Sequence, residues 1–326
     1  MGDIIFGLYS IVLGIAVSYA LYWLLNFLLS LLPQRIFQKV SWLSFLTPAA
    51  VLVIVVLIAP LFQTVIWSFK DDKVKEWVGF KNYVDLFTDI RFLGILLNNF
   101  LWVLVVPAIT VAIGTAAATL SNQVGPTREK IFKSLIFMPM AISFVAASTI
   151  WAYFYAYVPP GRPEIGFLNS VVISLGFEAQ PWLTMDQGRL NSFLLMIVLI
   201  WLQVGYSMVV ISAAIKNVPE ETLEAAQLDG ANAWNIFSKI VLPQVWGTVM
   251  SVFVTVLILV MKIFDIVLAM TRGNFTTSVL AFEWYKQFFE NSNIGPASAV
   301  VTVLVILIGP LMYLQIRTVQ QQELLR

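Results

Sequence analysis

The sequence predicts an all-α, polytopic membrane protein with about seven transmembrane helices. Of its 326 residues, 60% are apolar and only 11% are charged, and the mean hydropathy is +0.87. Soluble domains average about 45–50% apolar and about 25% charged residues, and a soluble chain of this length could not bury so much apolar surface. The apolar residues also gather in runs of about 20 or more, the length that a helix needs to cross a bilayer.

Seven apolar runs account for the predicted helices, at residues 4–31, 43–69, 93–120, 134–157, 190–215, 245–270 and 297–316. None shows the short alternating pattern of a transmembrane β-strand. No Lys or Arg precedes the first run, and its apolar stretch is longer than the core of a signal peptide. We therefore expect the first run to be a membrane span rather than a cleaved leader.

Residue types that the sequence lacks restrict its chemistry. There is no cysteine and no histidine, which excludes disulfides, thiolate metal sites, histidine-dependent triads and histidine–zinc sites. A net charge of +1 gives no argument for nucleic-acid binding, and there is no phosphate-binding loop of the GxxxxGK[ST] type. We predict a protein in contact with membrane lipid that is not an enzyme, with no catalytic residues, no metal, no cofactor and no nucleic-acid partner.

The segment between the fifth and sixth runs predicts a helix–turn–helix outside the bilayer. Asn217 is a candidate N-cap, and Pro219 suits a first helical turn, where its missing N–H is not needed. Two acidic residues follow, where the positive end of a helix dipole favours them. Gly230 ends this helix because glycine adopts the left-handed conformation at low cost. A second short helix is expected from about Asn232, and Pro243 restarts the chain into the sixth span.

This segment resembles the EAA loop of ABC-importer permeases. The match consists of Glu224, Ala225, Ala226, Gly230, Ile240, Val241, Leu242 and Pro243 at the spacing of that motif. The strings Leu228-Asp229-Gly230-Ala231, Phe264-Asp265, Thr271-Arg272-Gly273, Gly79-Phe80-Lys81-Asn82-Tyr83 and Leu86-Phe87 are similar to those of the carbohydrate-uptake branch, which contains maltose and α-glucoside permeases. The resemblance extends over about residues 43–316. The first span is an extra helix that the larger permease of such pairs often carries.

The resemblance implies a role for the loop and an orientation for the chain. In that family the EAA loop is cytoplasmic and docks on an ATPase subunit, so Glu224, Ala225, Ala226, Asp229, Gly230, Ile240, Leu242 and Pro243 would be ATPase-coupling residues. Basic residues do not orient the chain, because the two sets of loops carry nine each. The resemblance places the C-terminus in the cytoplasm and the N-terminus outside the cytoplasmic (inner) membrane. Its implied partners are a second, different permease, an ATPase dimer, an extracytoplasmic sugar-binding protein and a carbohydrate.

Two groups of polar residues within the spans are candidates for a solute path. Gln203, Tyr206 and Ser207 share one face of the fifth span and combine amide, hydroxyl and aromatic groups suited to a sugar. The same groups could instead bond neighbouring helices together. Lys262 and Asp265 lie late in the sixth span, three residues apart. They either form a mutual ion pair near the interface, where Lys can extend to water, or line the outer part of the path.

The sequence thus predicts half of the translocation path of a carbohydrate ABC importer, for an oligosaccharide such as an α-glucoside. The expected divisions are an extra helix and linker at 1–42, a permease domain at 43–316 with its coupling loop at 217–243, and a cytoplasmic tail at 317–326. Three alternatives remain: an ion-coupled secondary transporter, an ABC permease for a solute other than a sugar, and an intramembrane enzyme. An enzyme would need Ser–Lys or paired-Asp chemistry, for which no suggestive spacing is present.

Overall fold

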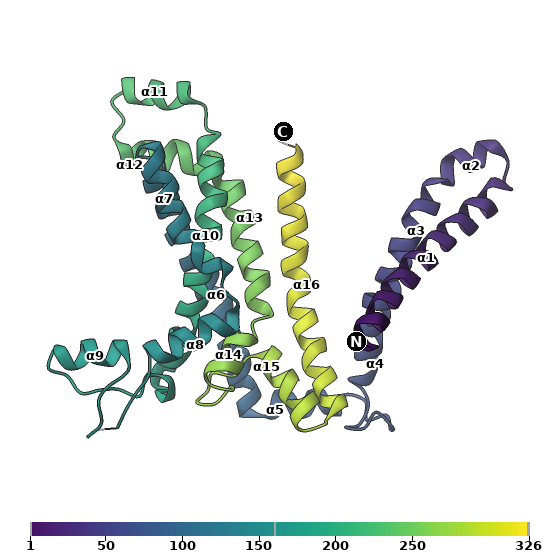
Figure 1. Ribbon diagram of the computed structural model, residues 1–326, viewed down its shortest axis with the longest axis horizontal. Coiled ribbons are helices and arrows are strands. Elements are labelled where there is room, and N and C mark those ends of the chain that lie inside the picture. The colour runs from purple at the N-terminus through teal and green to yellow at the C-terminus, as the bar shows by residue number, and fades with distance from the viewer. Residues whose placement is uncertain (1, 160, 325–326) are drawn as a thin grey trace. The chain divides into compact units, whose positions relative to one another are not determined.

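The computed structural model describes residues 2–159 and 161–324 and consists of helices joined by loops (Figure 1). No strand occurs in these residues apart from one isolated bridge between Lys70 and Trp77. The chain forms two compact units, the first ending at Trp67 and the second beginning at Ser68. The predicted all-helical membrane fold is confirmed: within the described residues, six helices are long and apolar enough to cross a membrane, or seven if one bent pair counts as a span.

The first unit is a pair of long apolar helical segments. Helix α1 (Gly2–Ser30) packs against α3 (Trp42–Val53), which is preceded by α2 (Gln34–Val40) and followed by the π-helical η1 (Ile54–Ile58) and α4 (Ala59–Trp67). The centroids of the Tyr22 and Phe45 rings are 4.9 Å apart. The most apolar stretch of each segment is unburied within the structure, as expected of helices whose solvent is lipid.

The second unit holds the remaining helices. They are α5 (Lys81–Thr88), α6 (Ile90–Ser121), α7 (Pro126–Phe137), η2 (Met138–Ala141), α8 (Phe144–Phe154), α9 (Phe167–Ser174), η3 (Trp182–Thr184), η4 (Gln187–Arg189), α10 (Leu190–Lys216), α11 (Glu220–Leu228), α12 (Ala233–Ile236), η5 (Phe237–Val241), α13 (Leu242–Met261), α14 (Asp265–Met270), α15 (Leu280–Tyr285), η6 (Lys286–Glu290) and α16 (Ile294–Leu324). Helix α16 continues eight residues beyond the predicted end of the last span at 316.

The fourth predicted span, 134–157, is wrong as a single straight helix. The segments 126–141 and 144–154 meet at an angle of 101°. Ile142 and Ser143 between them are extended, and the Ser143 side chain caps α8 by accepting a hydrogen bond from the Ala146 N–H at 3.2 Å. Pro139 lies just before the break and contributes no N–H of its own. Hydropathy located the apolar run, but it carries no information on whether the helix within the run is straight or bent.

The sixth predicted span, 245–270, is also interrupted. Helix α13 ends at Met261, Lys262 forms its C-cap, and α14 begins only at Asp265. At its other end α13 is continuous with α12 through η5, because the junction residues all keep helical dihedral angles. The second short helix of the loop therefore does not end before Pro243. A π-helical turn precedes the proline and shifts the local hydrogen bonds, as in the Leu242 N–H bond to the Phe237 carbonyl.

Helix α10 is the central helix of the second unit and packs against α6, α7 and α13. Two close contacts position it. A Cβ on Gly205 of α10 would lie 2.5 Å from the Ile136 carbonyl oxygen and 2.6 Å from the Phe137 Cα. A Cβ on Gly114 of α6 would lie 2.2 Å from the Ser207 Oγ. Small residues thus bring the α7 and α6 backbones against α10, the usual way in which helices associate within membranes.

The loops of the second unit lie at its two ends (Figure 1). One end carries α11, α12, the start of α7 and the final turns of α16, and the other carries α5, α14 and α15. The loop between α6 and α7 therefore lies at the same end as the helix–turn–helix between α10 and α13.

We predict that Gly205→Ala lowers the melting temperature of the purified protein in detergent. The added methyl group would overlap backbone atoms that cannot rotate away, and overpacking of this kind costs about 1–3 kcal/mol. Gly309→Ala is the matched control, because nothing lies within 4 Å of a Cβ at that helical glycine. Equal melting temperatures for the two variants would show that the Gly205 contact does not constrain the fold.

Candidate functional site

The helix–turn–helix between α10 and α13 is confirmed in its main features. Helix α11 runs from Glu220 to Leu228, and Gly230 follows with φ +79°. The Gly230 N–H donates to the Gln227 carbonyl and the Ala231 N–H to the Ala226 carbonyl, both at 3.0 Å. These two bonds form a Schellman motif, which requires a left-handed residue at the position of Gly230.

The start of each loop helix differs slightly from expectation. The N-cap of α11 is Pro219, whereas Asn217 is the C-cap of α10, so the prediction of Asn217 as an N-cap is wrong. Asn232 does cap α12, and its side chain accepts a hydrogen bond from the Asn235 N–H at 2.8 Å. Pro219 takes an extended conformation. The direction of α11 is therefore set in the turn that follows α10.

Most of the α11 surface is exposed. Ala226 is buried, whereas Glu224, Ala225 and Asp229 are exposed, and the Leu228 side chain is 89% exposed. Farther along the loop Pro243 is exposed, and Ile240 and Leu242 are partly buried. The apolar Leu228 is therefore exposed beside the acidic Asp229 at the end of the helix.

A cavity of about 650 Å³ lies beside the break in the fourth span. Gln203 and Tyr206 of α10 and Asp265 of α14 line it, together with Met140, Ile142, Ser143, Phe144, Val145, Thr255 and Leu259. Its volume falls within the usual range for small-molecule sites, about 300–1,000 Å³, and a few polar groups on an apolar wall are typical of them. The structure thus brings together residues from both groups that the sequence proposed, Gln203 and Tyr206 from the first and Asp265 from the second.

Ser207 and Lys262, the other two predicted path residues, are not among those lining this cavity. Ser207 is fully buried on the side of α10 that faces Gly114, so the three polar residues of the fifth span do not all face one space. Lys262 is exposed. Within the described residues it forms no ion pair with Asp265, because the helix ends between them and the expected helical spacing is lost.

The break residues Ile142 and Ser143 were missed from the sequence. A signal was available in Pro139 followed by the capping residue Ser143, both inside an apolar run. The cavity residues Thr255 and Leu259 were missed as well. They lie four apart on α13, but nothing in their spacing distinguishes a cavity wall from ordinary helix packing. The described residues contain no cluster of three side chains that could hold a metal ion.

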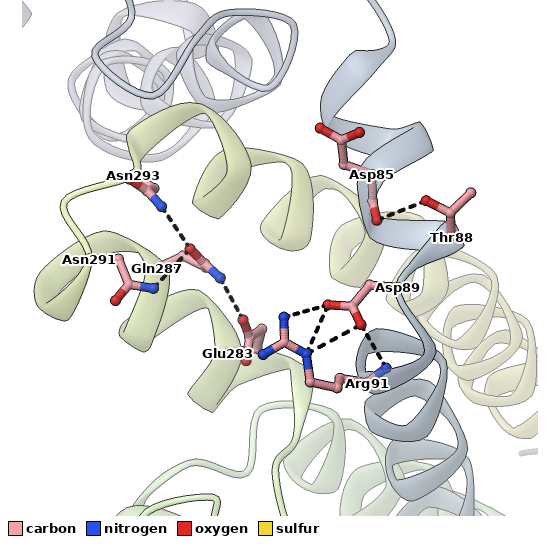
Figure 2. Close-up of polar contacts among 8 residues, drawn as sticks. All are labelled: Asp85, Thr88, Asp89, Arg91, Glu283, Gln287, Asn291 and Asn293. Atoms are coloured by element: carbon pink, nitrogen blue, oxygen red, sulfur yellow. Dashed lines mark hydrogen bonds and ion pairs between the residues drawn. The ribbon is translucent and has the colours of Figure 1, made fainter.

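A second, more polar pocket of about 740 Å³ is lined by residues of α5, α6, α15 and η6 and the loops beside them. Figure 1 shows α5 and α15 at the end of this unit opposite α11. Asp89 and Arg91 form an ion pair at 2.9 Å on one side of it. Figure 2 shows this pair beside a chain of hydrogen bonds in which Gln287 donates to Glu283 at 2.8 Å and Asn291 donates to Gln287 at 3.2 Å. The pocket therefore presents charges of both signs.

The Asp89 carboxylate also caps α6 by accepting a hydrogen bond from the Arg91 N–H at 2.9 Å. The Arg91 guanidinium, and after it this backbone bond, lower the pKa of Asp89 below its ordinary value. Because the pKa is lowered on folding, the resulting stability is present at neutral pH and is lost only as the pH falls through the lowered value. The pair therefore remains charged near neutral pH.

The loop that walls this pocket is fixed by buried amides. Asn98 donates to the Thr277 and Ser278 carbonyls, each at 2.9 Å, and Asn99 accepts from the Leu280 N–H at 2.6 Å. These bonds connect α6 to the segment between α14 and α15. They keep the pocket in place although three of its non-glycine residues, Arg189, Arg272 and Thr276, have positive φ angles.

A helical bundle with a broken span, a cavity beside the break and an exposed helix–turn–helix at one end defines a polytopic transport permease. Residues 108–322 match the family described as "Binding-protein-dependent transport system inner membrane component", and the chain belongs to this family. The sequence-based prediction of an ABC-importer permease is thereby confirmed.

Relatives and solved structures agree with this assignment. The chain is 40% identical to the alpha-glucoside transport system permease protein AglF of Rhizobium meliloti over 99% of both chains. It is 44% identical to the osmoprotective compounds uptake permease protein GgtC of Synechocystis sp. over 86% of this chain and all of the relative. It shares its fold with a chain of a bacterial alginate ABC transporter solved with a periplasmic protein (TM-score 0.74, 20% identity, covering 86% of this chain and 96% of that one).

We predict that Gly230→Val destabilises the loop more than Gly230→Asn does. No atom lies within 4 Å of a Cβ at this position, so the cost comes only from the φ of +79°. A β-branched residue pays about 1–2 kcal/mol there, whereas Asn adopts this conformation more readily. Limited proteolysis between residues 217 and 243 would measure the difference. Equal cleavage of both variants would show that the turn does not depend on the left-handed residue.

Proposed function

We propose that this chain forms half of the translocation path of an ATP-driven carbohydrate importer, with a neutral oligosaccharide such as an α-glucoside as its solute. The observation that carries the proposal is the exposed helix α11 with its Schellman turn at Gly230, which has the motif and the shape of a coupling loop. The α-glucoside permease similar over nearly its whole length supports the solute class, as does a diacetylchitobiose permease protein of Streptomyces coelicolor that is 29% identical over 82% of this chain.

The coupling role assigns a function to each part of α11. Glu224 offers a carboxylate to a basic group of an ATPase subunit, and charge-assisted hydrogen bonds are among the stronger polar contacts. Ala225 keeps the exposed surface low, so that a partner can approach closely, while Leu228 supplies apolar contact. Asp229 and Gly230 end the helix, and Ile240, Leu242 and Pro243 connect the loop to α13. ATP hydrolysis belongs to the partner subunit.

The proposed membrane orientation follows from the coupling loop. The end carrying α11 faces the cytoplasm together with the C-terminal end of α16, and the N-terminus lies outside the inner membrane. The pocket of mixed charge then faces outward, where it suits the docking of a binding protein better than an apolar surface would. Residues 43–316 form the proposed permease domain, which pairs with a second permease of the same kind.

The proposed solute path passes through the cavity of about 650 Å³. Tyr206 offers an aromatic face and a hydroxyl, Gln203 an amide, and Asp265 a carboxylate. Together they match a sugar, which presents hydroxyl groups around a flatter apolar surface. The exposed fraction of the Gln203 residue is only 6%, so a solute that reached its amide would be largely shielded from water. A hydrogen bond in such a shielded site is stronger than one in water.

One observation favours a second candidate, an ion-coupled secondary transporter. Broken helices beside a central site are common in that class, and the 101° break lines the cavity here. The two classes separate by energy source. Uptake that requires a co-expressed ATPase and survives an ionophore supports the importer, and uptake that the ionophore abolishes without any ATPase supports the alternative.

We predict that Glu224→Lys weakens ATPase binding or uncouples ATP hydrolysis from uptake. The side chain is exposed, so the variant should insert and fold, while its charge would repel a basic partner group. Losing a hydrogen-bonded charge pair across an interface costs about 2–5 kcal/mol. Co-purification with the ATPase and ATP-driven uptake measure the effect, with Lys239→Glu as a charge-changing control in the same loop. Wild-type values for Glu224→Lys would remove this residue from the interface.

We predict that Tyr206→Ala lowers uptake and that Gln203→Ala changes selectivity among sugars, both with little effect on assembly. Each side chain lines the cavity, although Tyr206 also packs against the hydrophobic core, and one hydrogen bond contributes about 0.5–1.5 kcal/mol to binding. Uptake of several sugars, normalised to assembled complex, measures both. The matched control is Ser207→Ala, on the other side of α10. Loss of assembly in proportion to uptake would make the two residues helix contacts.

A further inference from the structure

A polar cluster that neither the docking surface nor the cavity uses joins three helices at the α11 end of the bundle. Glu129 of α7 accepts hydrogen bonds from Lys133, one turn later in the same helix, and from Lys216, the last residue of α10, both at 2.5 Å. The Glu129 side chain is 14% exposed and that of Lys133 is 21% exposed. Glu129 and Lys133 are thus partly withdrawn from water, whereas the Lys216 side chain is 52% exposed, so water screens the Glu129–Lys216 bond more than the bond within α7.

The cluster continues to α6. Lys133 also donates to the Ser212 Oγ and, at 3.4 Å, to the Oδ1 of Asn122. Ser212 donates to the same Asn122 oxygen at 2.8 Å. Asn122 is the C-cap of α6, so a single connected set of hydrogen bonds joins the ends of α6, α7 and α10. The Nδ2 of Asn122 is buried and has no hydrogen-bond partner in the described residues, so this arrangement leaves one donor unsatisfied.

The position of the cluster connects the coupling loop to the cavity wall. Lys216 precedes the first residue of α11 by only four residues. Helix α7 leads in the other direction into η2, where Met140 and then Ile142 line the cavity. Gly205 of α10 lies against Ile136 and Phe137 at the far end of α7. Helix α7 therefore contacts α10 at both of its ends. The extended residues Ile142 and Ser143 are the first non-helical backbone after α7 and η2.

We propose that Glu129 is a positioning residue for energy coupling, whose bond to Lys216 makes α7 follow any displacement of α11. An ATPase that pushed on α11 would then move the Met140 side of the cavity relative to α8, with the change in direction taken up at Ile142 and Ser143. The proposal rests on the coupling function proposed above for α11. It adds a physical connection between two sites that share no residue, which is what a claim of coupling requires.

The test uses the complete transporter in proteoliposomes, with its permease partner, ATPase and binding protein, and measures ATP hydrolysed per solute transported. Lys216→Gln cuts the bond between helices but leaves the Glu129–Lys133 pair within α7. Lys216→Arg keeps a cation able to bond Glu129. Lys130→Gln is the matched control, because its exposed side chain is next to Glu129 in α7 and forms no ion pair in the described residues.

We expect Lys216→Gln to raise the ratio of ATP to solute about 2- to 30-fold, the range for residues that transmit coupling, with normal assembly. Lys216→Arg and Lys130→Gln should stay near the wild type, and Glu129→Gln should resemble Lys216→Gln. An unchanged ratio in Lys216→Gln and Glu129→Gln overturns the proposal. Loss of assembly in both also overturns it, because the cluster would then be structural.

A second measurement separates this proposal from the coupling role of α11. Because the chain has no cysteine, spin labels can be placed at Arg128→Cys in α7 and Glu221→Cys in α11, both exposed positions, with cysteine-free partners. The distance between the labels should stay constant on ATP binding in the wild type and change in Lys216→Gln. A distance that changes in the wild type rejects the proposal even if Glu224→Lys uncouples transport. Normal uptake in Glu224→Lys together with ATP-independent uptake would instead reject the coupling function itself.

Discussion

The second unit depends on the close approach of the α6 and α7 backbones to the backbone of α10. Within a bilayer the hydrophobic effect does not drive helices together, and contact area and polar bonds must do so. Gly114 and Gly205 supply the contact area by letting α6 meet Ser207 and letting α7 meet α10 backbone to backbone. Polar bonds then fix the register, at the Glu129 cluster on one end and at Asn98 and Asn99 on the other.

The break in the fourth span is possible because of this packing. Backbone groups outside a helix are costly in lipid unless protein or a cavity surrounds them. Here the Ile142 N–H bonds the Pro139 carbonyl at 3.0 Å, and the Ser143 hydroxyl caps α8. Both Ile142 and Ser143 also line the cavity. Holding α7 against α10 thus creates both the break and the space beside it.

Hydropathy and capping chemistry predicted those parts of the fold that depend on local sequence. The apolar runs located the spans, and Gly230 and Asn232 located the ends of the loop helices, because caps act through neighbouring backbone groups. Pro139 and Ser143 could have indicated an interruption of the fourth span, but nothing in the local sequence predicts its angle of 101°. The end of α13 at Lys262 has no proline or glycine to indicate it.

The candidate site likewise contains residues that the sequence predicted and residues that it could not predict. Gln203 and Tyr206 could be found from their spacing on α10, and the cavity contains both. Helical periodicity alone placed Ser207 with them, although it faces α6, because a helix buried on nearly all sides has no single polar face. The Glu129–Lys216 bond joins residues 87 positions apart. A sequence can suggest the pair between Glu129 and Lys133, but only the packed structure supplies its partner on α10.

The composition of the cavity wall suits a site that must both bind and release. Met140 precedes the break at Ile142 and Ser143, whereas Phe144 and Val145 follow it, and Gln203 and Tyr206 lie on α10. A change of angle at the break would move the two apolar parts relative to the polar groups on α10. If a solute lost two hydrogen bonds of about 1 kcal/mol each in that change, its affinity would fall about 30-fold. A difference of this size between two arrangements is what an energy source must exploit to move a solute in one direction.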